Sequence, residues 1–259
     1  MKSITIQLLL ILIFPFAVNS QTIKLHSSAG YINTKDSVRL FYRFTGEGKD
    51  TIVVFHGGGF GSAYLVPDLT PLAAHHTLLF FDQPGTGFSS VVSDTARLNI
   101  NQFVQDVEIL RNHFGMDKIK VLAHSNGGLM VGYYATIHPG KIESMILINP
   151  SAASQKWQNL NRFDSTSQLI LKQNRKIYRS APADTVKACW DYYAVWARGK
   201  FPTPLHARRM WGDVCDCNQQ NLLSPFLFYP LLSMGKWDIT AQLSAVKART
   251  LIIGGDKDE

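Results

Sequence analysis

KVLAHSNGG, the sequence at positions 120–128, contains an apolar strand signal, a serine between small residues and the start of a helix. Small residues are needed around the serine because a strand can turn so sharply into a helix only with a strained backbone. Such a turn lifts the hydroxyl of Ser125 above the end of a sheet and directs the first N–H groups of the helix toward it. Ala123 stands where the first glycine of such turns is usual. We predict that Ser125 is a catalytic nucleophile.

Strand and helix signals alternate on both sides of this stretch. Short apolar runs of strand type are separated by segments with helical spacing of apolar residues. This alternation predicts right-handed β-α-β units, and therefore an α/β fold with a mostly parallel sheet flanked by helices. The chemistry of such sheets lies at the carboxyl ends of the strands. The expected strands are 37–45, 51–55, 77–81, 120–123, 144–148 and 250–253, and the expected helices are 99–114 and 127–138.

A glycine-rich loop, HGGGFG at 56–61, directly follows one of these apolar strands. Backbone can approach a substrate oxygen closely only where side chains are absent. We predict that the N–H groups of Gly58 and Asn126 form an oxyanion hole, which stabilises negative charge developing in a transition state. We expect His56 to order the loop rather than to act as a base.

The sequence gives no pattern for a cofactor or a metal. DQPGTGFS, at 82–89, matches neither a P-loop nor a dinucleotide-binding loop, so we interpret its glycines as tight-turn residues. Cys189, Cys215 and Cys217 have no matched histidine pattern, which disfavours a zinc site. Cys215 and Cys217 are too close in sequence for an easy bridge. We therefore expect no cofactor, and one disulfide between Cys189 and either of the other two.

Residues 151–237 interrupt the alternation with a stretch rich in Trp, Tyr, Gln and Asn. We predict a helical cap inserted between two sheet strands, because strand signal resumes at 250; a linker followed by a separate domain is the alternative. The predicted organisation is a signal peptide at 1–20, the first part of the core at 21–150, the cap at 151–237 and the second part of the core at 238–259.

The amino terminus has the features of an export signal. Lys2 precedes an apolar run at 4–18, and small residues follow it, so cleavage before Gln21 and a secreted or periplasmic location are expected. An uncleaved membrane anchor is the competing interpretation, and stable membrane insertion is not expected after cleavage. The formal net charge is +7, but the basic residues are scattered, so a nucleic-acid partner is not expected. The sequence does not fix the oligomeric state.

Together these motifs resemble the α/β-hydrolase superfamily, and more closely its prolyl aminopeptidase-like branch. The resemblance rests on HGGGFG, DQPGTGFS and AHSNGG, with WDIT at 237–240 and LIIGGDKDE at 251–259, and it covers nearly the whole chain after the signal. It implies a triad in chain order Ser, Asp, His, with Ser125 as nucleophile and Asp258 as acid, or Asp256 as the fallback. It implies no cofactor and a small-molecule or short-peptide substrate.

The resemblance also implies that the catalytic histidine follows the acid, after one further strand. None of the eight histidines up to Glu259 matches that position. We therefore expect this sequence to be a C-terminal truncation of an active enzyme, or an inactive fragment, with the last strand missing and an apolar sheet edge exposed.

The substrate is less well defined than the fold. Gly59 stands where strict prolyl aminopeptidases have a proline, and residues 151–237 contain no glutamate to hold a substrate amino group. Release of an N-terminal proline or another small residue, a carboxylesterase-type activity, and a catalytically inactive hydrolase-fold protein therefore stay open. Ser125 argues against the dehalogenase and epoxide hydrolase relatives, which have an aspartate at this turn. The acids available in the cap are Asp164, Asp184, Asp191, Asp213 and Asp216.

Overall fold

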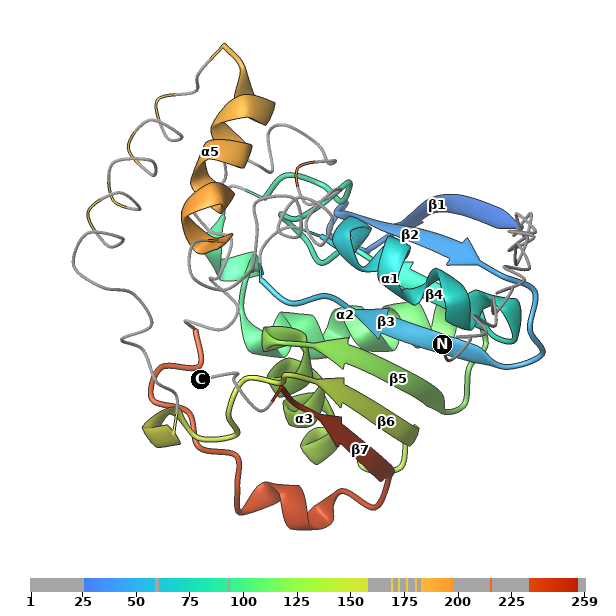
Figure 1. Ribbon diagram of the computed structural model, residues 1–259. Coiled ribbons are helices and arrows are strands. Elements are labelled where there is room, and N and C mark those ends of the chain that lie inside the picture. The colour runs from blue at the N-terminus through green and yellow to red at the C-terminus, as the bar shows by residue number, and fades with distance from the viewer. Residues whose placement is uncertain are drawn as a thin grey trace, which may run out of the picture.

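Seven strands form one sheet in the computed structural model, which describes residues 26–58, 61–92, 94–157, 169, 172, 176, 180, 183–197, 215 and 233–255 (Figure 1). The strand order is β1-β2-β4-β3-β5-β6-β7. The first two pairings, β1 with β2 and β2 with β4, are antiparallel, and the other four are parallel. The predicted mostly parallel sheet is confirmed. The strands are β1 (Ser27–Asn33), β2 (Arg39–Thr45), β3 (Thr51–Phe55), β4 (Thr77–Phe81), β5 (Ile119–His124), β6 (Ile142–Ile148) and β7 (Arg249–Ile253).

The helices lie on both faces of the sheet. α2 and α3 cover one face, and α1 covers part of the other (Figure 1). The four α-helices with described bounds are α1 (Val66–Leu69), α2 (Ile100–His113), α3 (Asn126–Ile137) and α5 (Thr185–Ala197). The 3₁₀ helices are η1 (Ala63–Leu65), η2 (Thr70–Ala74), η3 (Thr95–Arg97), η4 (Gln155–Trp157) and η5 (Gln242–Ala245).

The central strands are apolar because both of their faces are buried. In β3, Val53 and Phe55 pack with α2 and α3, whereas Ile52 and Val54 pack with α1 and η2. Successive side chains of a strand point to opposite faces, so each of the two core clusters takes alternate residues. The expected strands 51–55 and 77–81 coincide with β3 and β4.

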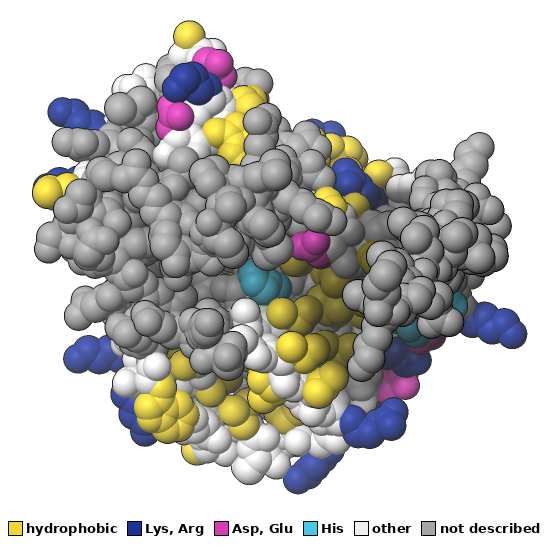
Figure 2. Space-filling model, in the orientation of Figure 1, with side chains coloured by type: hydrophobic (Ala, Val, Ile, Leu, Met, Phe, Trp, Pro, Cys, Tyr) yellow, Lys and Arg dark blue, Asp and Glu magenta, His cyan; other side chains and the backbone are white. Residues whose placement is uncertain are grey.

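The edges of the sheet differ from its centre. Leu251, Ile252 and Ile253 of β7, the last strand of the described sheet, are 54%, 64% and 46% exposed. Hydrophobic side chains gather over β6 and β7 in Figure 2. At the opposite edge, β1 was not predicted from the sequence, because its residues are mostly exposed and only Ile32 of the strand is buried. None of the described helices is long and apolar enough to cross a membrane.

Most of the predicted cap lies outside the described residues, but its two ends lie side by side. Ser154 forms an antiparallel bridge with Asp238. On either side of this bridge, the N–H of Gln155 donates to the carbonyl of Trp237 (2.9 Å), and the N–H of Ile239 donates to the carbonyl of Ala153 (2.9 Å). The chain therefore leaves the sheet after β6 and returns to the same place before β7. Within this segment, α5 lies beyond the carboxyl ends of the parallel strands (Figure 1).

Candidate active site

Ser125 lies in the turn between β5 and α3 with φ 53° and ψ −125°. A non-glycine residue in this region of backbone space costs about 1–3 kcal/mol and persists only where its surroundings hold it. Here the N–H of Ser125 donates to the carbonyl of Ile148 (3.0 Å), and its own carbonyl accepts from the N–H groups of Gly128 (2.9 Å) and Ser151 (3.0 Å). The Ser125 side chain makes no capping bond to α3. The backbone is held from both sides, while the partly exposed hydroxyl is not used to cap the helix.

Two glycines allow the loop after β3 to lie directly against this turn. A Cβ on Gly57 would come within 2.7 Å of the Cβ of Ser125, and a Cβ on Gly127 would come within 2.4 Å of the carbonyl oxygen of His56. Real Cβ atoms essentially never approach that closely, so both positions need glycine for the backbones to touch. The glycine-rich loop and the serine turn, which are far apart in sequence, are thus brought together as predicted.

His56 holds the peptide that carries the N–H of Gly58. Its Nε2 accepts from the N–H of Gln83 (3.3 Å), so the proton is on Nδ1, which donates to the carbonyl of Gly57 (2.6 Å) and lies 3.2 Å from that of Gly58. Burial lowers the pKa of His56, which favours the neutral ring. Because the peptide unit is planar, a fixed Gly57 carbonyl also fixes the direction of the Gly58 N–H. The expectation that His56 orders the loop is confirmed.

Asp82, directly after β4, joins its own loop to the loop after β3. It is 1% exposed, and its carboxylate accepts from the N–H of Ser62 (2.6 Å) and from that of Phe88 (2.8 Å). Ser89 adds a link by donating its hydroxyl to the Asp82 carbonyl (2.6 Å). This supports the structural interpretation of the DQPGTGFS loop.

The second predicted oxyanion donor, Asn126, is the first residue of α3. The first N–H groups of a helix have no partner within the helix, and the helix dipole makes them favourable neighbours for negative charge. The side chain of Asn126 points elsewhere, because its Oδ1 accepts from the hydroxyl of Ser151. The start of α3 and the glycine-rich loop therefore both lie against Ser125, which is the placement that the predicted donors Gly58 and Asn126 require.

Asp258 and its fallback Asp256 lie outside the described residues, as do Gly59 and Cys217. The start of their loop is described: the N–H of Gly255 donates to Oδ1 of Asn149 (3.1 Å), and the N–H of Asn149 donates to the carbonyl of Ile253 (2.7 Å). Asn149 also has a positive φ of 41°. Sequence reasoning missed this residue; the only signal was an asparagine directly after an apolar strand.

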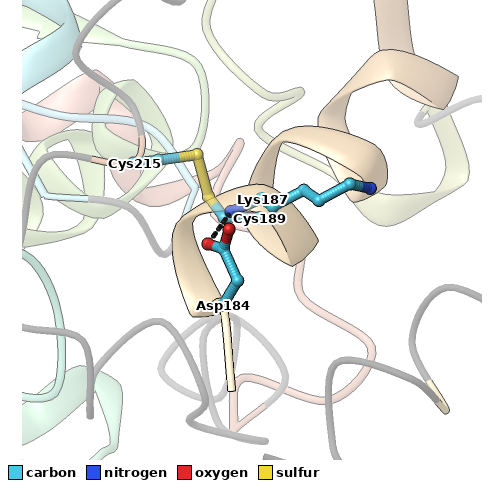
Figure 3. Close-up of a disulfide and its surroundings, with 4 residues drawn as sticks. All are labelled: Asp184, Lys187, Cys189 and Cys215. Carbon is cyan, nitrogen blue, oxygen red and sulfur yellow. Dashed lines mark hydrogen bonds between the residues drawn. A yellow bond between two sulfur atoms is a disulfide. The ribbon is translucent and has the colours of Figure 1, made fainter. Parts of the chain in front are cut away.

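The predicted disulfide is confirmed, and the structure selects Cys215 over Cys217 as the partner of Cys189 (Figure 3). Both bonded cysteines are buried. At the start of α5, the side chain of Asp184 accepts from the N–H of Lys187 (2.8 Å). Within the helix, Lys187 forms an ion pair with Asp191 (2.6 Å). Within the described ranges, no group of three or more His, Cys, Asp or Glu side chains could hold a metal ion.

Comparisons with known proteins agree with the fold. A family profile described as "alpha/beta hydrolase fold" matches residues 51–259. A proline iminopeptidase of Heyndrickxia coagulans is 25% identical over 89% of this chain and 82% of its own length, and one of Lactobacillus acidophilus is 27% identical over 84% and 78%. A solved carboxylesterase structure from Nitrososphaera gargenis superposes with a TM-score of 0.63 at 16% identity, over 88% of this chain and 80% of that one.

Proposed function

Because the chain belongs to the alpha/beta hydrolase fold family and is similar to prolyl aminopeptidases, we propose that it is a serine hydrolase with Ser125 as its nucleophile. The observation that carries the proposal is the backbone of Ser125, held at φ 53° and ψ −125° between β5 and α3 with the glycine-rich loop against it. A strained turn that is held by three backbone hydrogen bonds is the feature that an exposed nucleophile needs.

In the proposed reaction, a base removes the proton of the Ser125 hydroxyl while Oγ attacks the carbonyl carbon of an ester or amide. The carbonyl oxygen becomes an oxyanion, which the N–H groups of Gly58 and Asn126 stabilise. Collapse breaks the bond to the leaving alcohol or amine, which takes the proton from the base, and an acyl group stays on Oγ. Water, deprotonated by the same base, then attacks the acyl carbon; the bond from that carbon to Oγ breaks, the carboxylic acid leaves, and Ser125 Oγ regains a proton from the base.

The base in this proposal is a histidine oriented by Asp258, and the resemblance assigns it to a position after residue 259. The described histidines near the turn have other partners: both nitrogens of His56 bond loop atoms, and Nδ1 of His124 lies 2.6 Å from the hydroxyl of Tyr64. Experiments on activity therefore use the complete product of the reading frame.

For the substrate, we propose a small peptide or a small ester, with N-terminal proline release as the first activity to test. The similarity to proline iminopeptidases supports the peptide. One observation favours an ester as the second candidate. Of the five cap acids, Asp184 is used at the first turn of α5 and Asp191 in an ion pair with Lys187, which leaves fewer acids for a substrate amino group.

The nucleophile is tested with a fluorophosphonate probe, which bonds covalently to activated serines. We expect the wild-type protein to be labelled on the peptide that contains Ser125, Ser125→Ala to lose the label, and the control Ser90→Ala to keep it. Loss of the nucleophile lowers kcat on the order of 10⁴-fold or more. Labelling that persists in Ser125→Ala would contradict the proposal. Rates on a proline anilide and on short-chain aryl esters then separate the two substrate classes.

We further propose that the protein is exported, with cleavage before Gln21. The apolar segment at 4–18 supports this, and so does the Cys189–Cys215 disulfide, since such bonds persist mainly in oxidising compartments. Amino-terminal sequencing of the protein recovered from cells tests it: Gln21 is the expected first residue, and an intact Met1 would contradict cleavage.

A further inference from the structure

Tyr64, in η1, joins the glycine-rich loop to the serine turn through one hydroxyl group. The N–H of Gly57 donates to the Tyr64 oxygen at 2.9 Å, and the same oxygen lies 2.6 Å from Nδ1 of His124, the residue before Ser125. The two rings meet edge to face, with centroids 5.7 Å apart. Tyr64 lies outside the motifs that predict the site, and the activity proposed above does not use its hydroxyl.

The phenol has one proton and can accept at its oxygen. It accepts from the N–H of Gly57 and lies within hydrogen-bond distance of Nδ1 of His124, and burial raises the pKa of Tyr64, which keeps the phenol protonated. One hydroxyl is thus bonded both to the loop and to the turn. A tyrosine can make this double link, and a phenylalanine of the same shape cannot.

The link bears on the geometry of the oxyanion donors. Tyr64 holds the N–H of Gly57, and His56 holds the carbonyl of Gly57, so both polar groups of this glycine are bonded. The next N–H along the chain is that of Gly58. A Cβ on Gly57 would come within 3.1 Å of both the Tyr64 oxygen and Nδ1 of His124, so the three groups are packed without spare room.

We propose that Tyr64 is a positioning residue for the oxyanion hole, which fixes the Gly57–Gly58 backbone against the serine turn through His124. The proposal rests on the function proposed above. Tyr64 touches neither substrate nor nucleophile in this role; it sets where the Gly58 N–H lies relative to Ser125. Since an oxyanion donor acts on the transition state more than on the bound substrate, its misplacement lowers kcat and changes KM little.

The test compares Tyr64→Phe with Tyr134→Phe in the complete protein, with a short-chain aryl ester as substrate. Tyr134 is the matched control, because it is fully buried and its hydroxyl donates to Glu108 (2.6 Å) beneath the other face of the sheet. We expect Tyr64→Phe to lower kcat by about 10- to 100-fold with KM within about threefold, and Tyr134→Phe to leave kcat unchanged. Equal kcat values for Tyr64→Phe and wild type would overturn the proposal.

A second pair of variants tests the link from the other side and does not require Tyr64→Phe to fold. His124→Asn retains an acceptor near the position of Nδ1, whereas His124→Leu removes it. We expect His124→Asn to retain most of the wild-type kcat and His124→Leu to lose about as much as Tyr64→Phe; equal loss in both would contradict the proposal. Wild-type protein that is not labelled by fluorophosphonate at Ser125 would instead contradict the proposed function itself.

Discussion

The loops after β3 and β4 and the loop after β7 lie at the same end of the sheet but are held in different ways. Around β3 and β4, the buried groups of His56 and Asp82 bond backbone atoms of the loops after both strands, and all but the first residue of each strand are buried. The loop after β7 is described only as far as Gly255, whose N–H donates to Oδ1 of Asn149 in an exposed hydrogen bond.

Mutations in the two regions should therefore affect different properties of the protein. Buried polar groups are costly to leave unpaired, so a change near β3 and β4 should lower both the free energy of unfolding and activity. An exposed hydrogen bond contributes little to stability, so a change after β7 should affect mainly the position of the acid loop. The proposed nucleophile and oxyanion donors thus lie on loops held by buried groups, while the start of the loop proposed to carry the acid is held by Asn149.

The largest effect is expected for Asp82→Ala, which leaves the N–H groups of Ser62 and Phe88 without their buried acceptor. We expect the free energy of unfolding to fall by about 3 kcal/mol, and activity to fall with it, as measured by urea denaturation and ester hydrolysis. The control is Asp117→Ala, since the Asp117 side chain is 84% exposed and pairs only with Lys141 in the described contacts. Similar losses in both variants would contradict the buried role of Asp82.

A smaller loss of stability is expected for Gly127→Ala. The new Cβ would clash with the backbone oxygen of His56, at 2.4 Å, although alanine favours a helix over glycine by about 1 kcal/mol. We expect a net loss of about 1–2 kcal/mol and roughly 100-fold lower kcat, because the clash separates the turn from the glycine-rich loop. In Gly140→Ala, where nothing lies within 4 Å, neither quantity should change. A fully active Gly127→Ala would refute the close approach.

The pH dependence of stability tests the hydrogen bonds of Glu108 in α2, which lies beneath the sheet and away from both loop regions. Hydrogen bonds from Arg111 and Tyr134 lower the pKa of Glu108 to about 2, below its ordinary value of 4.5. Ionised Glu108 therefore stabilises the fold above pH 4.5, and this contribution is lost as the pH falls toward 2. Between pH 5 and pH 2.5, the free energy of unfolding of the wild-type protein should fall by roughly 1 kcal/mol more than that of Glu108→Gln, as measured by urea denaturation. An unchanged pH slope would contradict it.

The smallest effect on stability is expected for Asn149→Gly, which keeps the backbone at φ 41° accessible but removes the acceptor of the Gly255 N–H. We expect the free energy of unfolding to change by less than about 0.5 kcal/mol, while kcat falls about tenfold because the loop that carries Asp258 loses its described side-chain contact. A large loss of stability without a kinetic effect would reverse the difference between the two loop regions.

The strands that the sequence predicts are those with continuous apolar runs, and these include 250–253 within β7. The strands of the buried centre are continuous apolar runs, and the expected segments 51–55 and 77–81 match β3 and β4. The exposed β1 has no such pattern, and it forms because its backbone pairs along β2 over its whole length.

Side-chain partners were harder to predict than elements. The glycine spacing around Ser125 indicated a close approach of two loops, since only glycine permits it. Tyr64 and Asn149 gave no comparable signal, because Nδ1 of His124 is 60 residues from Tyr64 and the N–H of Gly255 is 106 residues from Asn149. For the same reason, composition limited the disulfide to Cys189 with one of two cysteines, and only the fold selected Cys215.

The measurement that tests the proposed mechanism most directly is a crystal structure of the complete protein after reaction with a small alkyl fluorophosphonate. The phosphorus should be bonded to Oγ of Ser125, with the phosphonyl oxygen at about 3 Å from the N–H nitrogens of both Gly58 and Asn126. An adduct on another residue, or a phosphonyl oxygen that faces solvent and contacts neither N–H, would contradict it.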